Sequence, residues 1–248
     1  MIRIYVREIC NNKEPRGDDD AYLWRIPAVA ALDRLELNSP VTFFVGENGA
    51  GKSTILEAVA VNYGFNAEGG TKNFHFSSRD THSSLERHIR LVKDPVRPKD
   101  GYFLRAESFY NAASYIETLD EEGMGPRLID SYGGVSLHRQ SHGESFLSLI
   151  MNRFGGNGFY VLDEPEAALS PTRQLSLLCR IHDLVEQGSQ FLIATHSPIL
   201  LAYPGADIYL LDERGISAVK YEETEHYQIS RRFLENPKRM LNTLFDMD

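Results

Sequence analysis

The stretch from Gly46 to Thr54 combines residue types that bind phosphate. It follows the P-loop pattern G-x-x-x-x-G-K-S. Its residues are Gly46, Glu47, Asn48, Gly49, Ala50, Gly51, Lys52, Ser53 and Thr54. The glycines let the backbone bend so that successive N–H groups can point at phosphate oxygens. Lys52 supplies a cation for the β- and γ-phosphates, and the Ser53 hydroxyl supplies an oxygen ligand for Mg²⁺. The stretch therefore predicts a site for a phosphorylated nucleotide and Mg²⁺.

A second candidate for chemistry is the carboxylate pair Asp163-Glu164, which follows the apolar run 159–162. Carboxylates at the end of a buried strand are costly to desolvate unless they have a partner. A metal ion and a water would supply partners, with Asp163 holding Mg²⁺ together with Ser53 and Glu164 polarising an attacking water. The alternative is an acidic turn that caps a strand before Pro165. We favour the metal site, because a P-loop lies upstream in the same chain.

Two further stretches carry weaker signals. Ser141, Gly143 and Glu144 precede the apolar run 146–151, and a serine and glycine at a helix start can bind an anion. The same pattern is also an ordinary helix cap. His196 follows the apolar run 190–194, where a single histidine is usually a structural residue. The pairs Ser170-Pro171 and Ser197-Pro198 are typical of a helix N-cap followed by a first-turn proline.

The elements that must position these residues follow from the apolar pattern. Residues 41–45 are β-branched or aromatic and predict a buried strand before the P-loop, and residues 55–61 predict a helix after it. Residues 2–7 alternate in polarity, and residues 21–26 could form a second strand, so an antiparallel flap is expected beside the main sheet. The aromatic residues of this flap could belong to the core, which we favour, or stack on adenine: Tyr5, Tyr22 and Trp24.

The middle and the end of the chain give coarser expectations. Strands are expected at 89–92 and 101–107, the latter ending in Glu107, and helices at 81–88 and 108–119. Residues 120–140 are rich in glycine and predict a link. Residues 222–245 predict a helical end, in which four basic residues form a solvated face or, less favoured, a binding patch: Arg231, Arg232, Lys238 and Arg239.

Length and composition limit the class of protein. The 248 residues with 42% hydrophobic content indicate one large domain or one domain with an inserted lobe. No apolar run is long enough to span a membrane, and the first seven residues do not resemble a signal peptide. Cys10 and Cys179 lie far apart, which suits the reducing cytoplasm and argues against a disulfide scaffold or a structural zinc site. The net charge of −9 argues against a surface that coats nucleic acid, although a local basic patch stays possible.

The order of these motifs resembles that of the ABC-type ATPases. The P-loop would be the Walker A motif, residues 140–144 the signature, residues 162–165 the Walker B motif and residues 195–197 the switch-histidine segment. The resemblance implies an α/β fold with a mainly parallel sheet, an N-terminal antiparallel flap and a helical lobe at about 64–155, within a single domain over 1–248. The signature departs from the family's Leu-Ser-Gly-Gly-Gln, since the chain has Gln140-Ser141-His142-Gly143-Glu144. The D-loop has Ser170 where the family usually has aspartate.

The resemblance also implies an activity, namely Mg²⁺-dependent hydrolysis of ATP to ADP and phosphate. Glu164 and His196 would be catalytic, and Ser53, Asp163 and Glu107 would hold the metal. Glu107 is the positional candidate for the Q-loop glutamine, which has no clear match in this chain. In the family two ATP molecules lie between two heads, so Ser141, Gly143 and Glu144 would contact the nucleotide of a second copy.

Within the family, the motif sequences look most like the soluble SMC/RecF-like ATPases, many of which act on DNA or in bacterial defence. Ser141 lies only 89 positions after Lys52, and the residues between them carry no heptads, so the chain resembles a compact head without a coiled coil. A nucleotide-binding subunit of an ABC transporter is the alternative, with a membrane protein as partner in place of DNA or a soluble protein. A nucleotide-gated switch that barely hydrolyses ATP is a third possibility, and Glu164 argues against it.

Overall fold

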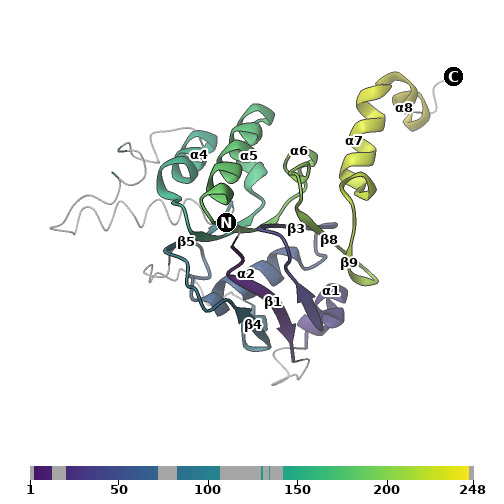
Figure 1. Ribbon diagram of the computed structural model, residues 1–248. Helices are drawn as coiled ribbons and strands as arrows, with labels where there is room; N and C mark the ends of the chain where they lie inside the picture. The colour runs from purple at the N-terminus through teal and green to yellow at the C-terminus, as the bar shows by residue number, and fades with distance from the viewer. Residues whose placement is uncertain are drawn as a thin grey trace.

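A computed structural model describes residues 3–12, 21–71, 83–106, 130, 134 and 142–245 of the chain. It is an α/β structure with one mainly parallel sheet, a smaller antiparallel sheet and helices on both sides (Figure 1). The expected helix at 108–119, nearly all of the link at 120–140, Glu107 and Ser141 lie outside the described residues. Within the expected lobe at 64–155, the described parts include two strands and one long helix.

The central sheet has six strands in the order β5-β6-β7-β3-β8-β9, and only β9 runs antiparallel to its neighbour. The strands are β3 (Val41–Val45), β5 (Asp100–Arg105), β6 (Gly158–Asp163), β7 (Gln190–Ala194), β8 (Asp207–Asp212) and β9 (Gly215–Ala218). Asp163 at the end of β6 lies in register with Arg105 of β5 and Ala194 of β7. The carboxyl ends of these strands therefore meet at one edge, where ligands of open α/β sheets bind.

The smaller sheet confirms the expected antiparallel flap but not all of its strands. It has the order β2-β1-β4, formed by β1 (Val6–Asn11), β2 (Arg34–Glu36) and β4 (Ile89–Lys93). Among the described residues, the expected strand at 2–7 is wrong for residues 3–5, since β1 begins at Val6 and the N–H of Tyr5 donates to the Gln190 side chain. The expected strand at 21–26 is also wrong. Leu23–Arg25 forms a 3₁₀ helix, and α1 (Pro27–Ala31) follows with a proline at its first position, where the fixed φ of proline favours a helix.

Helices cover the two faces of the central sheet separately (Figure 1). On one face lie α2 (Lys52–Tyr63) and the small sheet, and on the other lie α4 (His142–Arg153), α5 (Pro171–Glu186) and α6 (Pro198–Leu201). Each face of the central sheet has its own hydrophobic core, and alternate side chains of β6 pack into one or the other. Phe159 and Val161 pack with the α2 core, whereas Tyr160 and Leu162 pack with the core under α4 and α5.

The two helices at the C-terminal end, α7 (Glu225–Glu235) and α8 (Pro237–Leu244), extend beyond the sheet (Figure 1). They confirm the expected helical end but divide it at Asn236. The Asn236 side chain accepts a hydrogen bond from the N–H of Arg239 and so caps α8, which begins at Pro237. No residue of either helix is buried.

Several shorter expectations are also settled. Ser84–Arg87 forms a 3₁₀ helix within the expected helix at 81–88, and β4 and β5 confirm the two expected strands. Tyr5 belongs to the core, as expected, but Tyr22 is 48% exposed. Over the described ranges, no helix is long and apolar enough to cross a membrane.

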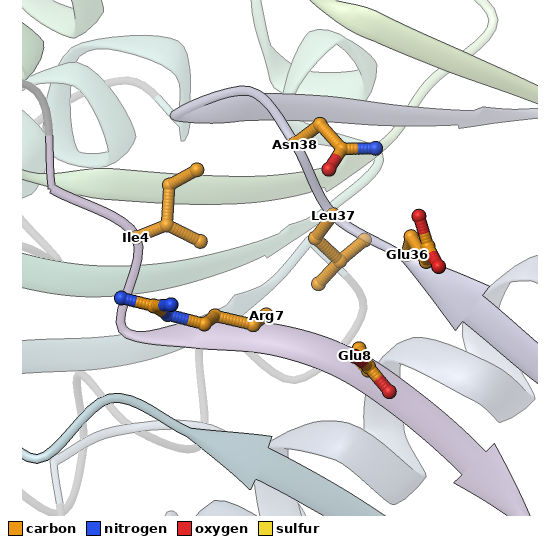
Figure 2. A pocket seen from close by; sticks show the side chains of 6 residues that line it. All are labelled: Ile4, Arg7, Glu8, Glu36, Leu37 and Asn38. Atoms are coloured by element: carbon orange, nitrogen blue, oxygen red, sulfur yellow. The ribbon is translucent and has the colours of Figure 1, made fainter.

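A pocket of about 470 Å³ lies beside the small sheet (Figure 2). Its lining is formed by Ile4, Arg7, Glu8, Glu36, Leu37 and Asn38. The charged groups of this lining are already used in ion pairs, since Arg7 pairs with Asp94 and both glutamates pair with Arg34. The pocket therefore lacks the convergent polar groups of a binding site.

Candidate active site

The P-loop connects β3 to α2 and has the expected strand–loop–helix context. Gly46, Gly49 and Gly51 have φ angles of 146°, 83° and 100°. Residues that carry a Cβ rarely adopt such φ angles. A Cβ at Gly46 would also lie 2.2 Å from the carbonyl oxygen of Leu211. Glycine at position 46 is therefore required by backbone angle and by space. The loop leads directly into the N-terminus of α2, which adds partial positive charge where phosphates would bind.

Lys52 is buried within this loop. Its Nζ donates hydrogen bonds to the carbonyl oxygens of Gly46 at 2.9 Å and Glu47 at 3.0 Å. Burial lowers the pKa of Lys52 below its usual value, and the carboxylates of Glu164, Asp163 and Glu166 oppose that shift. The lysine therefore lies in the electrostatic field of the Asp163–Glu166 segment, as expected for a cation that binds phosphate beside a metal site.

The Ser53 hydroxyl donates a hydrogen bond to Asp163 Oδ1 at 3.0 Å. Ser53 comes from the first turn of α2 and Asp163 from the last position of the buried strand β6. A hydroxyl and a carboxylate are the hard oxygen ligands that Mg²⁺ accepts, and Mg²⁺ commonly keeps several waters and uses only one or two carboxylates. These two residues fit the expected ion, which would stabilise the charge on a transferred phosphoryl group. Glu107, the third expected ligand, is not among the described residues.

Glu164 differs from Asp163 in both conformation and exposure. It is in the left-handed region, with φ of 51° and ψ of 53°, where the chain turns from β6 into the 3₁₀ helix Pro165–Ala168. Such a conformation costs about 1–3 kcal/mol and is concentrated at functional sites. The turn leaves 39% of the Glu164 side chain exposed, against 8% for Asp163. Asp163 is therefore placed as a fixed ligand and Glu164 as a group that water can reach.

His196 lies beside Glu164, with its Nε2 at 3.6 Å from Glu164 Oε1. The His196 backbone N–H donates to Glu166 Oε1, and its Nδ1 lies 2.9 Å from Nε2 of His226 in α7. The Nε2 atom is buried and makes no hydrogen bond within the described part of the chain. A buried ring nitrogen of this kind requires a hydrogen-bond partner. His196 Nε2 lies on the side of the ring that faces Glu164.

Sequence reasoning missed the roles of Glu166 and His226. Glu166 lies two residues after Glu164, so its place beside the other carboxylates was a usable signal. His226 is thirty residues beyond His196, in a stretch without a motif, and no sequence signal indicates it.

Arg105 is another residue that the sequence did not single out. Its Nη1 lies 2.6 Å from Glu57 Oε2 of α2, and its Nε lies 3.7 Å from Asp163 Oδ2. The Glu57 carboxylate also accepts a hydrogen bond from the Ser83 N–H. Arg105 is therefore held at the strand end where it compensates the charge of Asp163. The signal available in the sequence was its position at the end of the strand before Glu107.

The start of α4, where the signature was predicted, packs on the same chain. A Cβ at Gly143 would lie 2.4 Å from the carbonyl oxygen of Ala168, so glycine permits this close approach. Glu144 forms an ion pair with Arg173 of α5 at 3.1 Å. The Ser170 side chain accepts a hydrogen bond from the Arg173 N–H and caps α5, which confirms its expected capping role. Ser141 lies outside the described residues, so its contact with nucleotide stays a prediction.

Sequence comparisons match the chain with ATP-binding proteins. An AAA-domain family profile matches residues 30–121, and a second, described as the AAA domain of a candidate AbiEii toxin, type IV TA system, matches residues 117–202. The xylose import ATP-binding protein XylG of Moorella thermoacetica is 26% identical over 89% of this chain and 47% of its own length. The hemin import ATP-binding protein HmuV of Idiomarina loihiensis is 26% identical over 73% of this chain and 74% of its own length. The chain spans less than half the length of the sugar-import relatives that it matches.

Solved structures agree on the fold. An ATP-binding cassette of an ABC transporter superposes with a TM-score of 0.52 and 16% identity, covering 94% of this chain and 98% of its own. A part of the ABC transporter complex CbiONQ from Clostridium perfringens gives 0.51 and 15%, covering 98% and 100%. The chain thus has the α/β P-loop fold of ABC ATPases, which confirms the expected fold class. The names of the sequence relatives support the transporter alternative better than the SMC/RecF-like branch.

Replacing the P-loop lysine tests the phosphate site. Lys52→Ala should lower the affinity for ATP·Mg²⁺ about tenfold or more, because a charge-assisted contact of this kind contributes roughly 1.5–3 kcal/mol. Titration calorimetry measures this change. Lys93→Ala is the matched control, since Lys93 is another lysine whose pKa is lowered by burial, but it lies on the small sheet over the Tyr63 ring. Equal affinity in the Lys52 variant and this control would exclude the P-loop from nucleotide binding.

Proposed function

We propose that this chain is an Mg²⁺-dependent ATPase in which Lys52 and the P-loop bind the phosphates. The observation that carries the proposal is the contact of Ser53 with Asp163 at 3.0 Å, next to Glu164 and His196 at 3.6 Å from one another. In this proposal Ser53 and Asp163 hold Mg²⁺. Glu164 takes the proton of the attacking water, and His196 faces the γ-phosphate. A nucleotide switch without hydrolysis would not need a water-accessible carboxylate at this place.

We further propose that two copies of the chain enclose two ATP molecules. The P-loop helix α2 and the signature helix α4 pack on opposite faces of the central sheet. This arrangement supports a role for Ser141, Gly143 and Glu144 at the nucleotide of a second copy. Such an interface would be isologous, with each ATP in contact with both chains.

For the biological role, we propose that ATP hydrolysis drives a membrane transporter, with the chain at its cytoplasmic face. The support comes from the curated relatives, which are named as import ATP-binding proteins. A second candidate role is a soluble ATPase in DNA maintenance or defence. The specific observation behind it is the family profile over residues 117–202, whose description names a toxin–antitoxin system.

Capture of the ATP-bound form from its own cells separates the two roles. A tagged Glu164→Gln chain should hold ATP and its partner, and the transporter role predicts recovery of a specific integral membrane protein from the detergent-solubilised membrane fraction. Lys52→Ala, which should bind ATP weakly, is the control for non-specific capture. Recovery of the ATP-bound chain in the soluble fraction with DNA or a soluble protein would replace the transporter role by the second candidate.

A further inference from the structure

We propose that His226 of the C-terminal helix α7 is a positioning residue for ATP hydrolysis, because it fixes the ring of His196 with Nε2 directed at Glu164. This inference rests on the proposed ATPase function. It assigns a role to a residue that lies outside every motif of the chain. It also links α7, which otherwise extends from the domain, to the catalytic end of the sheet.

The geometry of the two rings determines how they share hydrogen. His196 Nδ1 and His226 Nε2 lie 2.9 Å apart, and the ring centroids lie 5.1 Å apart at 56°. One of these nitrogens must donate and the other must accept. If His196 Nδ1 were the donor, a neutral His196 would direct a lone pair of Nε2 at the Glu164 carboxylate, 3.6 Å away. If His226 donates, His196 Nε2 carries the hydrogen and faces the carboxylate favourably. For a neutral His196 the second arrangement is therefore the stable one, and in it His226 is the donor.

The charges around His226 agree with its role as a neutral donor. Burial lowers the pKa of His226, as do the neighbouring His196 and Lys52, while Glu225 opposes the shift. A neutral imidazole has one N–H, and in His226 this group donates its hydrogen bond to His196 Nδ1 at 2.9 Å. His226 then presents one defined hydrogen to His196, which sets the tautomer of His196 in the manner of an outer-shell partner.

The start of α7 is fastened close to His196, so His226 is held in place. Thr224 is buried and its side chain caps the helix by accepting a hydrogen bond from the N–H of Tyr227. The Tyr221 hydroxyl donates to the carbonyl oxygen of Pro198 at 2.9 Å, and Pro198 begins α6 two residues after His196. A short connected path therefore joins the first turn of α7 to the segment that carries His196. No residue of α7 is buried, and His226 in its first turn is the residue that contacts His196.

Two substitutions at position 226 test the role. His226→Ala should lower kcat about tenfold, the worth of one well-placed hydrogen bond, without changing the Kd for ATP·Mg²⁺. His226→Gln should restore most of the rate, because its amide N–H can donate to His196 Nδ1. His182→Ala is the matched control, since His182 also lies near a hydrogen-bonding ring, Tyr203 at 3.4 Å, but on α5. In a His196→Ala background, His226→Ala should have no further effect on kcat.

Nitrogen NMR of the His196 ring gives a readout that a merely structural contact would not change. In the wild type and in His226→Gln, His196 should be the Nε2–H tautomer, and in His226→Ala this preference should be lost. An active wild type together with an unchanged kcat and an unchanged His196 spectrum in His226→Ala would reject the role of His226 and leave the ATPase proposal intact. A wild-type chain without ATPase activity would reject the ATPase proposal, and with it any catalytic role of His226.

Discussion

Glu164→Gln is expected to hydrolyse ATP about 10²–10⁴-fold more slowly than the wild type, which is the usual worth of a general base. The substitution keeps the size of the side chain and its capacity for hydrogen bonds, so the left-handed turn at this position should be preserved. ATP binding should remain, because the phosphate contacts come from the P-loop and from Ser53. Steady-state phosphate release and titration calorimetry measure the two effects separately.

Two further carboxylates make this experiment selective. Glu186→Gln, at an exposed position near the end of α5, should hydrolyse ATP at the wild-type rate. Any effect of Glu166→Gln on the hydrolysis rate should arise through the position of His196, because Glu166 accepts the hydrogen bond of the His196 backbone N–H. If Glu164→Gln retains the wild-type rate, Glu164 is not the base, and Glu166 and His196 become the next candidates.

ATP is expected to convert the Glu164→Gln protein from a monomer to a dimer. A P-loop contacts a triphosphate from one side, and the proposed signature of a second copy would close the other side. ATP would then promote association because it binds the dimer better than the monomer. Without nucleotide, two chains with a net charge of −9 should repel each other at low salt. Light scattering with and without ATP·Mg²⁺ at tens of micromolar protein measures the mass directly.

Ser141→Arg separates the two faces of the proposed sandwich. It should prevent the dimer through bulk and charge at the signature, while the monomer still binds ATP through its own P-loop. Glu186→Gln, combined with Glu164→Gln, should leave the dimer intact. A mass that stays monomeric at saturating ATP would contradict the sandwich. Loss of ATP binding in Ser141→Arg would instead assign Ser141 to the site of its own chain.

The sequence was most informative where local pattern and chemistry coincide. The P-loop could be located because its glycines, its lysine and both flanking elements are consecutive, so no long-range contact was needed. Asp163 was identified because two carboxylates after four apolar residues contradict ordinary burial preferences. The order of the motifs then gave the fold class, which the structural comparisons confirm.

Prediction was weakest where tertiary contacts decide the outcome. The segment at 21–26 has the apolar content of a strand, but Pro27 begins a helix directly after it, and residues 34–36 form the edge strand that pairs with β1 instead. Arg105 and His226 reach the site through a strand register and a helix start that are far apart in the chain. His226 has no local pattern that differs from that of an ordinary surface residue, and the position of Arg105 at a strand end does not by itself indicate its contact with Asp163.

Successive side chains of β6 point to opposite faces of the central sheet, so the number of residues in this strand decides which face Asp163 occupies. Phe159, Val161 and Asp163 share the face of α2, which is why the carboxylate meets Ser53, while Tyr160 and Leu162 face the opposite core. An insertion or deletion of one residue within β6 would turn Asp163 to the wrong layer. A change of two residues would keep the layer but shift the carboxylate by about 6.6 Å along the strand, at about 3.3 Å per residue. Length variation in descendants of this chain should therefore accumulate in its loops, with the strand that leads to Asp163 unchanged in length.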